Sequence, residues 1–147
     1  MQKSRESSKQ RILAVLRTAV NRLEFLTTND WTLIIDKTTP VTFKKQDVLI
    51  QAGKRSKIVY LLVEGELKVT AAGTEVARIG PGGICGEMAF LENTIASATV
   101  TAEKEVEAFA IEWEKLADLF ELFPHLASRF YRSLALNLSR RLREQIS

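Results

Sequence analysis

The stretch that decides the fold lies at residues 86–100 and reads GEMAFLENTIASATV. The residues from Gly86 to Leu91 predict a brief helix, which follows a turn-forming Gly-Pro-Gly-Gly run at 80–83. Ser97 and Thr99 then alternate with apolar residues, and a period of two is typical of a strand. This stretch therefore predicts a turn, a short helix and a strand in direct succession.

The sequence on both sides of this stretch is rich in predicted strands. Between Val41 and Ile111, short segments of Val, Ile, Thr, Phe and Tyr are separated by turn-forming residues, among them Gly53, Gly65 and Gly73. This spacing is typical of an antiparallel barrel or sandwich of about eight strands. We expect the barrel to occupy residues 38–111.

The N-terminal region predicts an amphipathic helix. From Ser8 to Leu26, apolar residues recur at three- and four-residue spacing, which places them on one helical face. The helix either packs on its own barrel or forms a seam with a partner. Capping residues at 27–30 end it, and a short helix from Trp31 to Ile35 is expected to follow. We accordingly divide the chain into an N-terminal helix, 1–28, and one domain, 29–147.

The C-terminal region, residues 112–146, predicts two helices. A helix from Glu112 to Phe123 precedes Pro124, and proline is favoured in the first turn of the next helix. The last helix carries apolar residues four apart, and such a stripe drifts by about 40° per step around the helix. We expect its first members to pack on the domain and its last members to meet another chain as a homodimer; these are Phe130 and Leu134, then Leu138, Leu142 and Ile146.

Several ordered motifs resemble the cyclic-nucleotide-binding domain family, the type found in cyclic AMP receptors and kinase regulatory subunits. Residues 86–100 are similar to its phosphate-binding cassette, which reads Gly-Glu-x-Ala-Leu and then Arg-Ser/Ala-Ala-Thr-Val. Residues 48–69 resemble its second to fourth strands, 108–111 its last strand, and 123–125 onward its hinge and lid helices. The resemblance implies an eight-stranded antiparallel jelly-roll-like barrel, mainly β, with an N-terminal helix and C-terminal hinge and lid helices.

The cassette chemistry suits a sugar and a phosphate. The expected ligand-binding residues are Gly86, Glu87, Met88, Ala89, Ala96, Ser97 and Ala98. Glu87 can accept a hydrogen bond from a ribose 2'-hydroxyl, and the backbone N–H groups at the helix start, including that of Ala89, suit an anion. Ser97 adds a hydroxyl or an N–H. As an alternative, Glu87 caps its own helix or pairs with a neighbouring cation.

One position departs from the family pattern. Ala96 stands where the family has an arginine, whose guanidinium forms a bidentate, charge-assisted pair with the phosphate. Loss of such a partner costs roughly 2 to 5 kcal/mol, or about 30- to several-thousand-fold in affinity. Arg55, Lys57 and Arg78 are the cations that could replace it, and the sequence alone places none of them near the phosphate. We therefore expect weak or lost binding of cyclic AMP and cyclic GMP.

Composition limits the other possibilities. A chain of 147 residues with a net charge of +3 suits one ordinary domain, not a surface covered with nucleic-acid contacts. The single Cys85 excludes a disulfide framework, and the apolar run Ile12–Leu16 is too short for a signal peptide or a membrane span. These features predict a cytoplasmic protein without a metal site or a cofactor. His125 lacks metal-ligand companions.

Two classes of function follow, and neither is an enzyme, because no catalytic triad, isolated carboxylate pair or phosphate loop is present. In the first, a nucleotide or nucleoside-like ligand closes the last helix over the barrel and signals to an output module. In the second, the pocket is vestigial and the domain is an interaction or dimerisation module. The sequence ends on the lid helix, so we expect no specific DNA-binding element.

Overall fold

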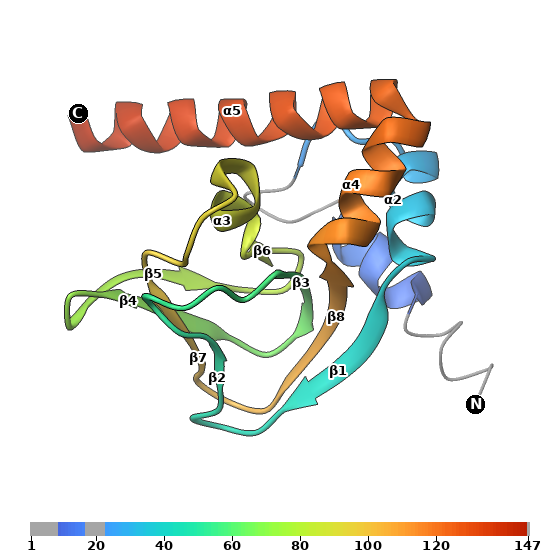
Figure 1. Cartoon of the computed structure of the whole chain (residues 1–147). Helices are drawn as coiled ribbons and strands as arrows, with labels where there is room; N and C mark the ends of the chain where they lie inside the picture. The colour runs from blue at the N-terminus through green and yellow to red at the C-terminus, as the bar shows by residue number, and fades with distance from the viewer. Residues whose placement is uncertain (1–8, 17–22, 147) are drawn as a thin grey trace.

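The computed structural model describes residues 9–16 and 23–146 of the chain. Residues 9–16 are helical. The elements that follow (Figure 1) are α2 (Thr28–Ile35), β1 (Thr39–Phe43), β2 (Val48–Ile50), β3 (Ile58–Glu64), β4 (Leu67–Ala71), β5 (Thr74–Ile79), β6 (Ile84–Cys85), α3 (Glu87–Glu92), β7 (Thr99–Ala102), β8 (Val106–Glu112), α4 (Trp113–Leu122) and α5 (Pro124–Ile146).

The strands form two four-stranded sheets, in the orders β1-β8-β3-β6 and β2-β7-β4-β5. Paired strands run antiparallel throughout. Sequence neighbours such as β1 and β2 lie in different sheets, so the chain crosses repeatedly between them, as in a jelly roll. The predicted mainly β fold with flanking helices is confirmed (Figure 1).

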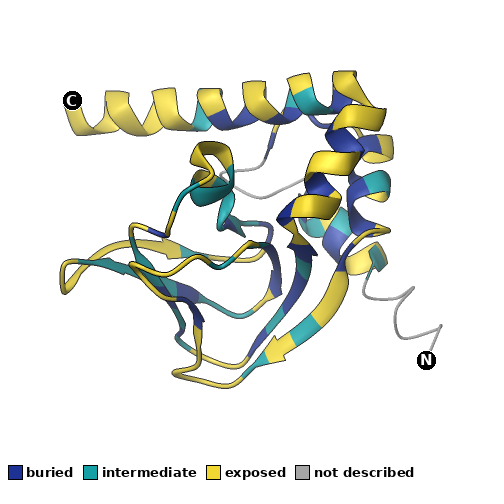
Figure 2. Ribbon diagram, in the orientation of Figure 1, coloured by how far each residue is buried: buried dark blue, intermediate teal, exposed yellow. Residues whose placement is uncertain are grey.

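Strand β3 is buried on both faces because it lies between the second sheet and the helices. Val59, Leu61 and Val63 belong to a cluster that includes residues of the helices. Tyr60 and Leu62 point the other way, into a cluster between the two sheets. This double burial explains why β3 reads as a continuous apolar run instead of an alternating one. Figure 2 shows the buried residues concentrated where sheet and helices meet.

The N-terminal helix packs on its own domain. Ile12 and Leu16 are 0% and 3% exposed and join the cluster that includes residues of the helices. The expected extension of this helix to Leu26 is wrong at its end, because residues 23–26 form a turn in which the Leu26 N–H donates to the Leu23 carbonyl at 3.1 Å. Leu23 and Leu26 are nevertheless buried. Their three-residue spacing therefore comes from a turn that buries both side chains, and not from a helix.

Two parts of the expected N-terminal helix, Ser8 and residues 17–22, lie outside the described residues. The division of the chain at residue 28 stays a prediction. The second helix, α2, begins at Thr28, earlier than the expected Trp31. The cause is a capping box: the Asp30 N–H donates to Thr27 Oγ1 at 3.0 Å, and the Thr27 N–H donates to Asp30 Oδ2 at 2.9 Å.

Helix α5 begins at Pro124, as the position of that proline predicted. Its apolar stripe becomes progressively exposed toward the C-terminus, as the drift around the helix requires (Figure 2). The exposed fractions are 2% for Phe130, 6% for Leu134, 41% for Leu138, 57% for Leu142 and 78% for Ile146. The first two therefore pack on the domain, and the last three form an exposed stripe, which we call the distal stripe.

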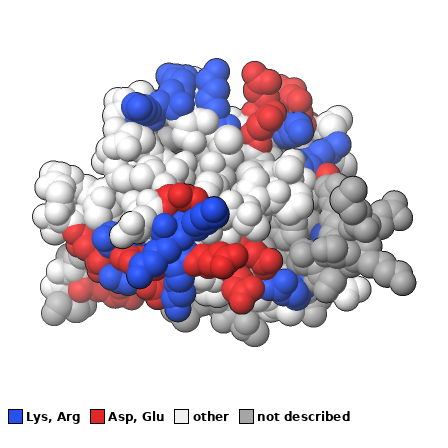
Figure 3. All heavy atoms as spheres, turned by 90° about the horizontal axis from the view of Figure 1, so that it is seen from below, with Lys and Arg blue, Asp and Glu red and all other residues white. Residues whose placement is uncertain are grey.

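Charges of both signs are mixed on the face seen from below (Figure 3). The acidic side chains of the sheets have basic neighbours: Arg11 pairs with Glu64 and Glu107 at 2.9 and 3.0 Å. Arg78 pairs with Glu66 and Glu75. This view of the surface therefore shows no continuous basic patch of the kind that nucleic-acid binding requires.

Candidate functional site

The cassette begins at a backbone position that only glycine fits. Gly86 has φ +89°, and a Cβ built on it would lie 2.5 Å from the Ile58 carbonyl oxygen and 3.3 Å from Val59 Cα. The close approach to β3 fixes the turn from β6 into α3. Asn93 ends α3 in the left-handed region at φ 50°, and its N–H donates to the Phe90 carbonyl at 3.3 Å. The predicted short helix is therefore present, bounded by two left-handed residues.

Glu87 is the first residue of α3 and is partly buried. Burial raises the pKa of its carboxyl to about 7, and hydrogen bonding by its own N–H and the charge of Arg141 oppose this rise. The side chain therefore lies near the N-terminus of its own helix and feels a cation from α5, which passes above α3 (Figure 1). The backbone N–H groups at the start of α3 and the charge of Arg141 therefore act on Glu87, and its role toward a ligand stays a prediction.

The other expected site residues differ in accessibility. Met88 is 40% exposed, whereas Ala89 is partly buried against the cluster of the helices. Ser97 is exposed, and Ala98 is partly buried. Cys85, directly before the cassette, is buried, and burial together with the Glu87 charge raises the pKa of its thiol. A thiol in this state is a packing residue, not a nucleophile.

Ala96, which the resemblance places at the family's arginine position, is buried. It is 8% exposed and packs in the cluster between the sheets. Its backbone pairs with the β2–β3 loop: the Gly53 N–H donates to the Ala96 carbonyl at 2.8 Å, and the Ala96 N–H donates to the Lys54 carbonyl at 3.1 Å. The methyl group therefore fills apolar space. The β2–β3 loop, residues 51–57, lies directly beside residues 96–99, which we call the exit from the cassette.

The structure distinguishes two of the cations that the sequence offered as replacements. Arg78 of β5 is engaged by Glu66, in the turn between β3 and β4, and by Glu75 of β5. Arg55, in the β2–β3 loop, contacts the cassette itself, with Nη2 3.4 Å from the Asn93 carbonyl oxygen. Sequence reasoning did not separate these residues, because the contact depends on how two loops pair through their backbones.

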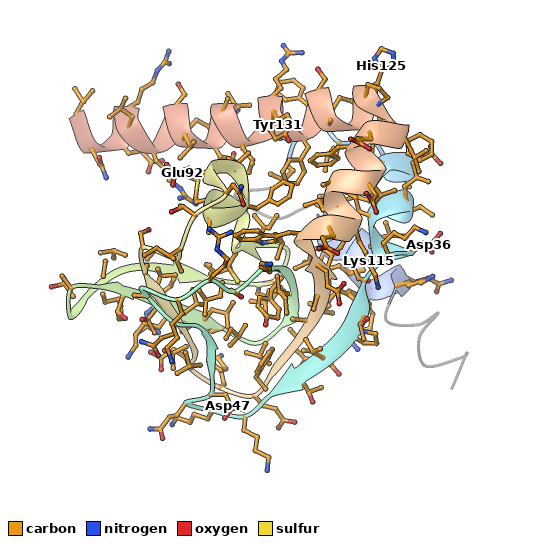
Figure 4. All side chains as sticks on the ribbon, in the orientation of Figure 1. Asp36, Asp47, Glu92, Lys115, His125 and Tyr131 are labelled. Atoms are coloured by element: carbon orange, nitrogen blue, oxygen red, sulfur yellow. The ribbon has the colours of Figure 1, made fainter. Side chains whose placement is uncertain are left out.

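Aromatic side chains connect the cassette helix to the lid helices. Phe90 of α3 packs edge-on against Trp113 and Phe120 of α4, with both pairs of ring centroids 6.0 Å apart. Phe120 in turn contacts Phe130 and Tyr131 of α5 at 5.0 and 5.4 Å. Tyr131 points from α5 toward the cassette side of the domain (Figure 4). A shift of α3 would therefore be felt by α4 and α5 through direct contact.

Helix α5 is also held from its other side by the segment that leads into α2. The Phe25 N–H donates to Ser133 Oγ at 3.0 Å, and the Arg132 guanidinium lies 4.0 Å from the centroid of the Phe25 ring. Farther along, Arg140 pairs with Glu24 at 3.2 Å. These contacts fix the lid helix over the domain in this conformation.

No further chemistry is evident in the described part of the chain. His125 points outward at the start of α5 (Figure 4), and no group of His, Cys, Asp and Glu among residues 9–16 and 23–146 is arranged to hold a metal ion. Within the same residues, no helix has both the length and the apolar composition that crossing a bilayer requires.

Comparison with known proteins identifies the family. The model of the cyclic nucleotide-binding domain matches residues 40–122. The chain is 30% identical over 144 residues to cyclic GMP-binding protein C of Dictyostelium discoideum. This alignment covers 89% of this chain and 6% of that protein. It is 33% identical over 118 residues to glutaminase 2 of Bradyrhizobium diazoefficiens, with 80% of this chain and 19% of that protein covered. The chain thus spans a small part of these relatives.

A solved structure shows the same fold. The cyclic nucleotide-binding domain from Methylobacillus flagellatus aligns with a TM-score of 0.77 at 20% sequence identity, over 92% of this chain and 79% of that one. This likeness shows the fold, which is the two-sheet arrangement described above. Because the family model matches more than half of the chain, at residues 40–122, the chain belongs to the cyclic nucleotide-binding domain family.

Proposed function

We propose that this chain is a non-enzymatic regulatory domain that senses a nucleotide or nucleoside-like ligand, with weak or lost binding of cyclic AMP and cyclic GMP. The observation that carries this proposal is the burial of Ala96, which puts a methyl group into apolar packing at the position of the family's arginine. A cytoplasmic location is part of the proposal.

The energetic argument rests on charge. A guanidinium that meets a phosphate makes two charge-assisted hydrogen bonds, and its removal costs roughly 2 to 5 kcal/mol of binding free energy. Glu87 remains and carries a negative charge above its pKa of about 7. The retained carboxylate and the missing guanidinium both favour a ligand with little negative charge, such as a nucleoside, over a cyclic nucleotide.

The aromatic contacts support a sensing role. Phe90 lies in the expected ligand-binding helix and touches Trp113 and Phe120 of α4, and Phe120 touches Tyr131 of α5. A ligand that moves α3 would therefore change the packing of the lid helix, and an attached or partner module could read that change.

A second candidate function is an interaction or dimerisation module with a vestigial pocket. The distal stripe supports it, because Leu138, Leu142 and Ile146 are 41%, 57% and 78% exposed. Three apolar side chains along one side of a helix suit a helix–helix contact between two copies of the chain. In this reading the output is assembly, and no small molecule is needed.

Calorimetric titration with cyclic AMP, cyclic GMP and adenosine distinguishes the two candidates, together with a thermal-shift screen. The sensing proposal expects adenosine to compete with or exceed the cyclic nucleotides. A low-micromolar dissociation constant for cyclic AMP would overturn the weak-binding proposal. Absence of any heat or thermal shift with all three ligands, combined with a stable dimer, would favour the interaction module.

A further inference from the structure

The β2–β3 loop is fastened to the exit from the cassette at three points. The Ala52 N–H donates to Thr99 Oγ1 at 3.1 Å, the Gly53 N–H donates to the Ala96 carbonyl at 2.8 Å, and the Ala96 N–H donates to the Lys54 carbonyl at 3.1 Å. Two of these bonds join backbone to backbone, so they hold whatever side chains the loop carries. The residue after Lys54 therefore starts from a fixed place beside the site of the missing arginine.

That residue is Arg55, and its guanidinium reaches the cassette. Nη2 lies 3.4 Å and Nη1 3.5 Å from the carbonyl and side-chain oxygens of Asn93, which ends α3. Both contacts are long, and both acceptors are neutral. Among the described residues, the ion pairs do not include Arg55, whereas Arg78 is engaged by Glu66 and Glu75. The guanidinium of Arg55 is therefore not neutralised by a carboxylate, and it can turn toward an anion by giving up two weak hydrogen bonds.

We propose that Arg55 supplies the guanidinium that contacts the ligand phosphate in this domain, in place of the family's arginine, whose position Ala96 occupies. This inference rests on the proposed ligand-sensing function and applies to a ligand that carries a phosphate, that is, to a nucleotide instead of a nucleoside. The cation then comes from the β2–β3 loop and not from the cassette. Because Arg55 is exposed, its contact with a phosphate is screened by water and salt, and it recovers only part of the affinity that a buried arginine gives.

The loop contains a matched control. Lys57 carries the same charge and is also exposed, but its contact with the rest of the domain is through its carbonyl, which accepts the Trp113 N–H at 2.9 Å. Arg55→Ala and Lys57→Ala thus remove one positive charge each from the same loop, and Arg55→Ala alone removes a side chain that touches the cassette. Neither substitution alters a buried side chain.

The test is an NMR titration of the wild type and both variants with cyclic AMP and with adenosine, each taken to millimolar concentration at low and high salt. Arg55→Ala should weaken cyclic AMP binding about three- to tenfold and leave adenosine binding unchanged. Lys57→Ala should change cyclic AMP binding less than about twofold. The salt dependence of cyclic AMP binding should be smaller in Arg55→Ala than in the wild type.

Three outcomes would overturn the inference, and they separate it from the proposed function. Unchanged cyclic AMP binding in Arg55→Ala, with a wild type that does bind, overturns the role of Arg55 alone. Equal losses in Arg55→Ala and Lys57→Ala also overturn it, because they indicate a general charge effect. A wild type that binds neither ligand overturns both the inference and the ligand-sensing function.

Discussion

The carboxylate of Asp30 and the guanidinium of Arg129 form a bidentate ion pair, with Oδ2–Nε and Oδ1–Nη2 distances of 2.6 and 2.7 Å. Asp30 is 2% exposed and also accepts the Thr27 N–H. The pair joins the first turn of α2 to α5, so the anchor of the lid helix depends on a buried charge whose hydrogen bonds are satisfied.

Asp30→Asn should destabilise the domain by about 1.5 to 3 kcal/mol at neutral pH, because it weakens the charge-assisted hydrogen bonds that the buried carboxylate accepts from Arg129. The hydrogen bond from Arg129 is the main cause that lowers the pKa of Asp30 below its ordinary 3.8. The stabilisation is therefore complete above pH 3.8 and is lost as the pH falls below it. Urea unfolding across this range measures the effect.

Asp36→Asn is the matched control for Asp30→Asn. Asp36 pairs with Lys9 at 2.7 Å, but its side chain is 53% exposed. Loss of such a surface pair should cost less than about 1 kcal/mol. Equal destabilisation by the two substitutions would contradict the role assigned to the buried pair.

Gly86→Ala should destabilise the domain more than Gly73→Ala does. Both glycines have positive φ, +89° and +79°, but a Cβ at residue 86 would lie 2.5 Å from a backbone oxygen, and one at residue 73 would meet nothing within 4 Å. Gly73→Ala should therefore cost about 1 to 2 kcal/mol for its backbone conformation alone. Gly86→Ala adds about 1 to 3 kcal/mol of overpacking. Thermal unfolding of both variants tests the order, and the reverse order would refute it.

Glu87→Gln should stabilise the domain at alkaline pH. Burial raises the folded pKa of Glu87 from 4.5 to about 7, so the folded state binds more protons than the unfolded state between these values, and stability falls as the pH rises through them. An amide does not carry this cost. We expect the variant to gain on the order of 2 kcal/mol over the wild type at pH values above 7, and little below 4.5. A gain that does not depend on pH would show that packing is responsible.

Ala96→Arg should raise cyclic-nucleotide affinity at least about tenfold, because it restores the bidentate phosphate partner. Ala96 is buried, so added bulk alone has a stability cost, and Ala96→Met controls for it. Calorimetry with cyclic AMP should show the gain only in the arginine variant. A folded arginine variant without a gain would indicate that the expected pocket is not the binding site.

Leu138→Ser combined with Leu142→Ser should abolish dimers and leave the domain folded, because both side chains are already 41% and 57% exposed. Light scattering measures the molar mass, and circular dichroism checks the fold. Leu122→Ser provides the control, since Leu122 is 72% exposed but lies on α4, away from the distal stripe. A wild type that is already monomeric at high micromolar concentration would remove the basis for dimerisation.

The fold could be predicted from the sequence because its signals are local. Turn glycines, the proline at 124 and the short period of the strands act over a few residues, and each corresponds to an observed element. The end of the N-terminal helix could not be predicted, because Leu23 and Leu26 keep a helical spacing while buried in a turn. In that case tertiary burial outweighs the local pattern.

The site could be predicted only in part. The motif indicated the cassette and the arginine position, and both stay predictions. The contacts of Arg55 with Asn93 span 38 residues, and those of Arg129 with Asp30 span 99. The raised pKa of Glu87 likewise results from burial by the assembled domain. Long-range pairing and desolvation arise only when the chain is folded, so no local pattern contains them.

The contact between Phe90 and Trp113 gives the domain an optical probe of its own. Trp113 is 8% exposed and begins α4, and its ring packs edge-on against Phe90 of α3, so its indole emission depends on the packing of α3. The other tryptophan, Trp31, lies on α2. In a Trp31→Phe background, tryptophan fluorescence would come from Trp113 alone and would follow movement of α3 without any attached dye.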